Sequence, residues 1–278
     1  MGRFFVKIHF SGSTLKVVAA IGMLSLVSIP AAAQFRQPRP KTGKPTPRFT
    51  DGHPDLGNGK GVWDVQIAQD LSRGDRYKWL DATVEVPMLP HTKELFDVAQ
   101  ATLSKDDPEG YCLPPGIPRL MNTPFVMQIY QLADRVMQVY EGGAHMWRPI
   151  YTDGRKHTPA DKWNPTYLGE GIGSWAGDTL VVDVTGFNTR TWLDAAGHQH
   201  GEKLHVTERY TRDDYDTLHY QATIEDPEFY SKPWTVGWHI SWVEGWEPYE
   251  YICQENNKDV VIENHMVGAT PSDNKKKP

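Results

Sequence analysis

The sequence predicts an all-β domain, mainly antiparallel, folded as a lipocalin-like barrel or a sandwich with one short helix. After residue 120 the chain contains at least eight short segments in which polar and apolar residues alternate, separated by tight turns. Helical segments do not alternate with these strands, which argues against a parallel βαβ sheet. The run of hairpins and the Gly61-Val62-Trp63 step at its start favour a barrel, but a sandwich would show the same alternation.

The N-terminus has the three parts of a secretory signal. Basic residues without any acidic residue come first, an apolar run follows from 17 to 29, and alanines stand at 31–33. The apolar run is shorter than a membrane-spanning helix requires. We therefore expect a signal peptide over residues 1–33, a periplasmic or secreted protein, and no stable membrane insertion after cleavage.

The charge of the chain limits its partners. Removal of the signal takes away three basic residues, so the formal net charge moves from −6 to −9 over about 245 residues. An acidic protein is a poor partner for nucleic acid, which binds to basic surfaces. Nucleic acid is therefore not an expected partner. The expected partner is a small-molecule ligand or substrate, and the oligomeric state is left open.

Composition divides the remaining chain into three parts. Residues 34–60 are rich in Pro, Lys, Arg and Gly, and they predict a disordered leader because they contain little to bury. A single β domain is expected over 61–268. The polar residues 269–278 predict a flexible tail.

One helix is expected over 92–104, at an end or on the outside of the sheet. Leu95, Phe96, Ala99 and Leu103 recur at the three- and four-residue spacing of a helical face, and prolines flank the segment on both sides. The strands follow from alternation and from turn residues between them. The predicted pairs and single strands are 125–131 with 136–140, 147–151, 172–175 with 179–185, 205–212 with 217–225, and 234–243 with 247–253.

The chain has two cysteines, Cys112 and Cys253, and we expect them to form a disulfide. Export places both in an oxidising compartment, where two thiols usually pair. The bond would close a loop of about 140 residues and stabilise the fold. Two buried free thiols are the alternative, and metal ligation by two distant thiols is a third reading.

The hairpin over 205–225 turns a charge inward in either register. A loop with an even number of residues places His205 and Arg209 on the same face as Tyr220. An odd loop moves every side chain to the other face and turns Glu208 inward instead. A buried charge must be paired or must line a wet cavity. The inward charge therefore marks either a ligand cavity or a structural ion pair at the barrel rim.

The connection over 191–200 holds the densest group of reactive side chains. A histidine held by a carboxylate titrates near neutral pH and can move a proton in either direction. We expect His200 to act as a base oriented by Asp194, with Arg209 or Arg155 holding a developing negative charge. The structural alternative is a polar loop in which the His and Asp side chains only cap turns.

A divalent metal is a second possibility for this connection, and no other cofactor is expected. His198 and His200 stand in an H-x-H order that could ligate one ion, with Asp194, Glu141 or His145 completing the shell. The sequence lacks the motifs of serine hydrolases, zinc proteases, phosphate-binding loops and dinucleotide-binding folds.

Eight short segments form a motif set. They are CLPPGIPR at 112–119, YTDGR at 151–155, WAGDTLVVD at 175–183, GFN at 186–188, TWLD at 191–194, VTERY at 206–210, KPWT at 232–235 and YICQEN at 251–256. Together they resemble a large family of exported bacterial proteins of unknown function, over roughly Gly61 to Val267. The resemblance implies export and a cysteine pair, and it nominates positions without giving them roles. The family has Pro-His-Ser or Pro-His-Thr where this chain has Gln199-His200-Gly201.

The leading functional hypothesis is an exported hydrolase or lyase that acts on a small aromatic or sugar-like molecule by His/carboxylate acid–base chemistry. Glu208 and His145 are further catalytic candidates. One alternative is a non-catalytic, lipocalin-like carrier, and another is an envelope-associated structural protein without a ligand site. Aromatic rings can stack on such a substrate and charged groups can orient it. The candidate substrate-binding residues are Trp192, Trp147, Arg155, Tyr220 and His205.

Overall fold

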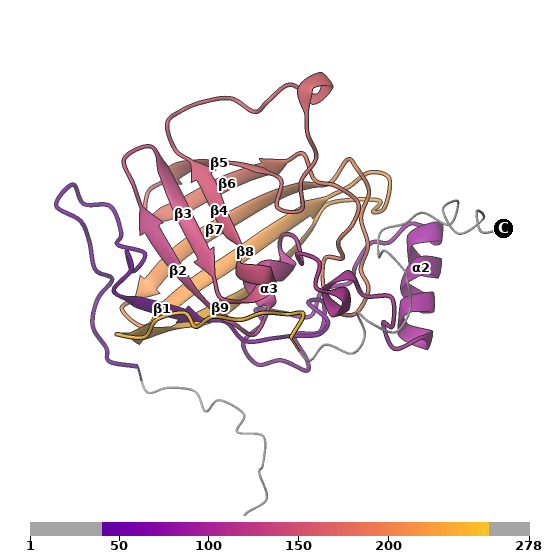
Figure 1. The fold of residues 1–278 in the computed structure, drawn as a ribbon, viewed down its shortest axis with the longest axis horizontal. Coiled ribbons are helices and arrows are strands. Elements are labelled where there is room, and N and C mark those ends of the chain that lie inside the picture. The colour runs from indigo at the N-terminus through magenta and orange to yellow at the C-terminus, as the bar shows by residue number, and fades with distance from the viewer. Residues whose placement is uncertain (1–40, 256–278) are drawn as a thin grey trace, which may run out of the picture. The chain divides into compact units, whose positions relative to one another are not determined.

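Nine strands close into a barrel in chain order in the computed structural model, which describes residues 41–255 (Figure 1). Each strand pairs with the next in antiparallel fashion except β4 and β5, which are parallel, and β9 pairs with β1 to complete the circle. The expectation of a mainly antiparallel all-β domain is confirmed, and the architecture is the barrel rather than the sandwich.

The helices and strands follow one another with short connections, apart from the long segment before α2 and those before β5, β7 and β9. The strands are β1 (Gly61–Asp64), β2 (Val126–Gln131), β3 (Arg135–Tyr140), β4 (Trp147–Tyr151), β5 (Glu170–Ala176), β6 (Thr179–Thr185), β7 (His205–Asp214), β8 (Thr217–Glu225) and β9 (Trp234–Glu244). The helices are α2 (Pro90–Ala101), α3 (Gly142–His145) and the short 3₁₀ turns η1 (Pro108–Tyr111), η2 (Arg119–Asn122) and η3 (Ala160–Lys162).

Alternation along the strands builds the core. On β8, the side chains of Leu218, Tyr220, Ala222 and Ile224 are all fully buried, while the residues between them are partly exposed. This is the period of two that a strand with one inward face requires. One expected strand is wrong: residues 247–253 form no strand, because β9 takes its second partner from β1.

A bulge decides the register of the β7–β8 hairpin. The pairing shifts between Arg212 and Asp214, so β7 contains one extra residue, Asp213, just before the turn. Glu208 consequently lies opposite Ala222 on the inward face, and Arg209 lies opposite Gln221 on the outward face. The odd register is therefore the observed one, and the even register, with Arg209 and His205 inside, is wrong.

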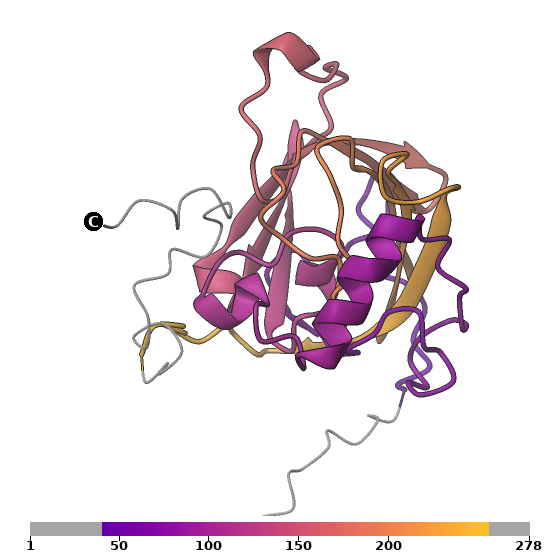
Figure 2. The ribbon, with the colours of Figure 1, turned by 90° about the vertical axis from the view of Figure 1, so that its right-hand side faces the viewer.

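Helix α2 lies across one end of the barrel (Figure 2). The backbone N–H of Leu89 and the hydroxyl of Thr92 both donate to the carbonyl of Phe229, at 2.9 and 2.7 Å. Ala99 packs so closely on the 191–200 connection that a side chain at Gly197 would clash with it, 2.4 Å from its Cβ. The predicted helix is present and covers an end, although it stops before Leu103, which is 91% exposed.

The larger part of the expected leader, residues 41–60, belongs to the compact unit that contains the barrel. The compact unit begins at Lys41, and Leu56 is fully buried in the core. The Leu56 backbone accepts a hydrogen bond from Trp63 Nε1 at 2.8 Å and donates one to Gln131 Oε1 at 2.7 Å. The domain therefore starts about twenty residues before Gly61. The expected signal peptide at 1–33, the first part of the leader and the expected tail at 269–278 lie outside the described residues.

None of the helices within residues 41–255 has the length and apolar character to span a membrane.

The expected disulfide is present. Cys112 and Cys253 are bonded, with their Cα atoms 5.6 Å apart and 141 positions apart in the chain. Cys112 directly follows η1, and Cys253 lies in the mostly exposed segment after β9. The bond therefore fastens the chain beyond the last strand to the turn that contains η1.

Replacing both cysteines with alanine should lower the free energy of unfolding by about 2–4 kcal/mol, because the bond restricts a long loop in the unfolded chain. Urea unfolding of the double variant and of the parent protein measures the difference. The parent protein with its disulfide reduced serves as the control and should unfold like the variant. Equal stability of oxidised and reduced protein would show that the bond is not structural.

Candidate functional site

A buried ion pair lies inside the barrel between β4 and β7. Arg148 donates from Nη1 and Nη2 to both carboxylate oxygens of Glu208, and the two side chains are only 1% and 0% exposed. The hydroxyls of Tyr210 and Tyr220 donate to Glu208 Oε1 at 2.7 and 2.8 Å. Gln138 Oε1 accepts a further bond from Arg148 at 3.3 Å. These contacts satisfy the carboxylate, as a charge removed from water requires.

The pKa values of Arg148, Tyr210 and Tyr220 are all raised in this network. Burial alone would lower the pKa of Arg148, but the Glu208 carboxylate outweighs it and raises that pKa well above its usual value. Burial raises the pKa of Tyr210 and Tyr220, and the negative charge of Glu208 adds to the increase. Both phenols therefore remain hydrogen-bond donors. The inward charge predicted from the sequence is thus paired inside the barrel, and the almost complete burial of both side chains separates the pair from the exposed rim.

Asp194 is the centre of the 191–200 connection. Its Oδ1 accepts the backbone N–H groups of Ala196, Gly197 and His198 at 3.1–3.2 Å. Its Oδ2 accepts the N–H of Leu71 at 3.0 Å and Nδ1–H of His198 at 2.7 Å. The residue is fully buried. Asp194 thus pairs with His198, and its expected pairing with His200 is wrong.

Charge pairing shifts the pKa values of both partners. Burial alone would lower the pKa of His198, but the charge of Asp194 and its hydrogen bond outweigh burial and raise it. Burial alone would raise the pKa of Asp194, but His198 and the backbone donors lower it. The His198 ring also stacks on Phe96, with ring centroids 4.5 Å apart. These contacts hold the His–Asp pair rigidly and favour its ionised form.

His200 is held differently. Its Nδ1 lies 3.0 Å from the carbonyl of Gly201, and its Nε2 lies 2.8 Å from the hydroxyl of Thr191. A carbonyl can only accept, so Nδ1 carries the proton and Nε2 accepts from Thr191. Burial lowers the pKa of His200, which favours this neutral form. Both ring nitrogens are engaged within the protein, and the residue is 3% exposed.

The expected H-x-H metal ligands are not brought to one point. Among residues 41–255, His198 and His200 share no group of three whose ligand atoms lie within 4.8 Å of one another. His198 instead groups with Asp194 and Asp70. This second carboxylate comes from the segment between β1 and α2, and no pattern in the sequence joins that segment to the connection.

A cleft of about 770 Å³ opens beside the Asp194 connection. Ala195 and Ala196 of the connection line it, together with Asp70, which links the buried His–Asp pair to the cleft. The other walls are the end of α2, η1 and the 69–77 segment. They contribute the charged and aromatic side chains Arg76, Tyr77, Lys105, Asp107 and Tyr111.

Two of these charged groups are already engaged. Asp107 accepts two hydrogen bonds from the buried Arg119 at 2.7 and 2.6 Å, and Lys105 forms an ion pair with Asp106 at 2.9 Å. The Arg76 guanidinium, in contrast, forms no hydrogen bond or ion pair with any residue in the 41–255 range. An exposed guanidinium at the edge of a cleft is suited to a planar anion, such as a carboxylate.

The remaining candidate residues lie away from this cleft. Trp147 is 63% exposed on β4. Arg155 is bound by Asp153 and lies 3.8 Å over the Tyr151 ring.

Three further candidates have other roles in the fold. His205 is bonded to Asp183 on the outer face of the barrel, and Trp192 is half-buried beside Gly197. His145 ends α3, and its side chain lies outside the described part of the structure.

Comparisons of the chain with protein-family models, with curated proteins and with solved structures found no match.

Proposed function

We propose that this chain is an exported protein that binds a small anionic molecule with a planar ring in the cleft beside the Asp194 connection. The volume of the cleft lies in the range of known small-molecule sites. Its walls offer a guanidinium for the anion and two phenol rings for the planar part. The disulfide next to η1 supports a rigid wall, and its presence suits an oxidising compartment.

The unpaired guanidinium of Arg76 carries this proposal. Among the cations that line the cleft, Lys105 is paired with Asp106, whereas Arg76 is not paired with any residue of the 41–255 range. The carboxylates that line it, such as Asp70, repel an anion, so Arg76 is the group that a ligand anion would bind. The polar lining is unlike that of a carrier for lipids, whose cavity would be mainly apolar. The motif segments that resemble an exported bacterial family support the same compartment.

Replacing Arg76 with glutamine should weaken the binding of an aromatic carboxylate by about tenfold or more, because a charge-assisted hydrogen bond is worth about 1.5–3 kcal/mol. Ligand-observed NMR with benzoate, phenylacetate and glucuronate as probes measures the affinities. Arg190→Gln is the matched control, because Arg190 is also exposed and lies outside the lining of the cleft. Binding that survives Arg76→Gln but falls in the control would place the site elsewhere.

A catalytic function is the second candidate, because Asp70 brings a carboxylate of the cleft next to the His198–Asp194 pair. The ligand atoms of Asp70 and His198 lie within 4.8 Å of each other, so a movement of the Asp70 side chain into hydrogen-bond distance would let a proton pass between the buried imidazole and a ligand. Under this reading Asp70→Asn should keep the affinity for a bound probe and abolish its conversion. A probe that binds and stays unchanged over hours with the parent protein supports the carrier instead.

A further inference from the structure

Two histidines face each other on the outside of the barrel. His219 on β8 and His239 on β9 are direct partners in the strand register. Their neighbours Leu218, Tyr220 and Trp238 are fully buried, so the two imidazoles stand on the opposite, outer face. The rings are stacked, with centroids 4.4 Å apart and planes 7° from parallel.

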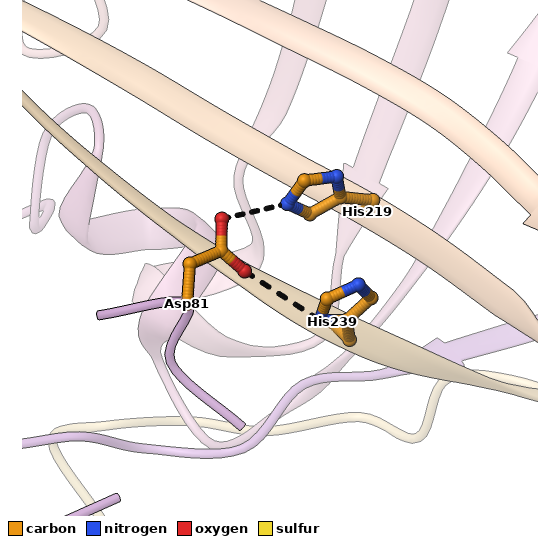
Figure 3. Close-up of side chains that lie close together, drawn as sticks. All are labelled: Asp81, His219 and His239. Carbon is orange, nitrogen blue, oxygen red and sulfur yellow. Dashed lines mark hydrogen bonds and ion pairs between the residues drawn. The ribbon is translucent and has the colours of Figure 1, made fainter. Parts of the chain in front are cut away.

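Asp81 approaches these rings from the segment between β1 and α2 (Figure 3). Its backbone N–H donates to the carbonyl of Gly237 at 2.9 Å, and the N–H of His239 donates to the carbonyl of Trp79 at 3.1 Å. Gly237 makes the approach possible, because a Cβ at this position would lie 2.2 Å from Asp81 Oδ2. The segment is thus fixed on the barrel with its carboxylate directed at both rings.

The distances suit a small cation. Asp81 Oδ2 lies 2.8 Å from His219 Nε2, and Asp81 Oδ1 lies 3.6 Å from His239 Nδ1. Two ligands held about 2.0–2.1 Å from one tetrahedral ion are separated by about 3.3 Å, a value between these two. One ligand atom from each of the three residues lies within 4.8 Å of the others. Side-chain rotations that tilt the two stacked rings toward each other would bring all three donors onto one ion, because the nitrogen lone pairs of parallel rings do not converge.

The geometry points to a binding site for a divalent transition metal of the zinc type, formed by Asp81, His219 and His239 on the outer face of β8 and β9. Two imidazoles and one carboxylate are donors that Zn²⁺, Cu²⁺ and Ni²⁺ prefer, whereas Ca²⁺ and Mg²⁺ prefer oxygen ligands. The site is open to solvent, since the His239 side chain is 48% exposed. Asp213 Oδ2, 3.6 Å from His239 Nε2, adds negative charge beside it.

Metal binding here would fasten the 73–83 loop to the barrel. Arg73 and Thr83 form an isolated bridge at the base of this loop, and Asp81 lies within it. Arg76 and Tyr77 lie on the same loop and line the cleft. An ion on Asp81 would therefore hold that wall of the cleft more firmly, since a ligand that binds only the folded state stabilises it.

Calorimetric titration of the untagged full chain with ZnCl₂, after treatment with a chelator, tests the site. We expect one Zn²⁺ per chain, no competition from Mg²⁺, and a higher midpoint of thermal unfolding with Zn²⁺. His219→Gln and Asp81→Asn should each weaken binding by roughly tenfold or more, since loss of even a supporting partner of a ligand has effects of that size. His53→Gln, a change at another exposed histidine, should leave the affinity unchanged.

Two results would overturn the assignment. The first is a parent protein that binds no Zn²⁺ at millimolar concentration. The second is binding that persists in both His219→Gln and Asp81→Asn, which would move the ion to the Asp70–Asp194–His198 group. Because His219 and Asp81 stand on the outside of the barrel, circular dichroism should confirm that the variants are folded.

Discussion

Replacing Glu208 with leucine should destabilise the protein by about 3–5 kcal/mol, because the variant leaves the Arg148 guanidinium charged, buried and without its anion. Arg148 is 1% exposed and cannot reach water without opening the barrel. The hydroxyls of Tyr210 and Tyr220 would lose their acceptor at the same time. Urea unfolding followed by tryptophan fluorescence measures the loss.

The double variant Arg148→Met with Glu208→Leu is the control for this interpretation. It removes both charges and replaces them with apolar side chains of similar volume, which is often neutral for a buried pair. We expect it to be more stable than either single variant, so that the two changes are strongly non-additive. A double variant with the summed losses of the two singles would show that the ion pair is not the source of the effect.

The barrel was accessible to sequence reasoning because eight of its nine strands, β2 to β9, carry their own signal. Alternation and turn residues predicted 147–151, 179–185 and 217–225 with the bounds that the structure has. The register of the last hairpin was not accessible, because it depends on one bulged residue between Arg212 and Asp214. A bulge is a matter of local backbone conformation and leaves no clear mark in the alternation.

The partner of Glu208 could have been found. Arg148 and Ile150 alternate on β4, so a strand with Ile150 buried also turns Arg148 inward. One inward Arg and one inward Glu in the same barrel are expected to pair, although 60 positions separate them. Sequence reasoning selected Arg209, the next residue in the chain, and did not consider Arg148 as a partner. The structure turns Arg209 outward.

The candidate site was predicted only in part. The 191–200 connection does hold a buried His–Asp pair, but the tight loop brings Asp194 to His198, four positions away, and not to His200. The cleft residues were out of reach, because Arg76, Tyr111 and Ala196 come from segments that meet only in the folded chain. The pairing of His219 with His239 could have been predicted, because both occupy outward positions in predicted strands that follow one another in the chain.

Replacing Asp194 with asparagine should cost about 3 kcal/mol of folding free energy near pH 5.5, because it removes the charge that a buried imidazolium and four backbone N–H groups share. The amide of the variant also turns a donor toward the Leu71 N–H or toward the His198 ring. Asp97→Asn is the matched control: its ion pair with Lys93 is exposed, so the change should stay within about 0.5 kcal/mol.

The pH dependence of this loss follows from the two pKa shifts. The raised pKa of His198 gives stability that is fully present below the ordinary value of 6.5 and is lost as the pH rises through the folded-state value. The lowered pKa of Asp194 gives stability that is fully present above the ordinary value of 3.8 and is lost as the pH falls through the folded-state value. The difference between parent and Asp194→Asn should therefore be largest between these two values and should shrink in alkaline solution. A difference that grows from pH 6 to pH 9 would mean that the imidazole is neutral in the folded protein and that Asp194 acts only through its backbone contacts.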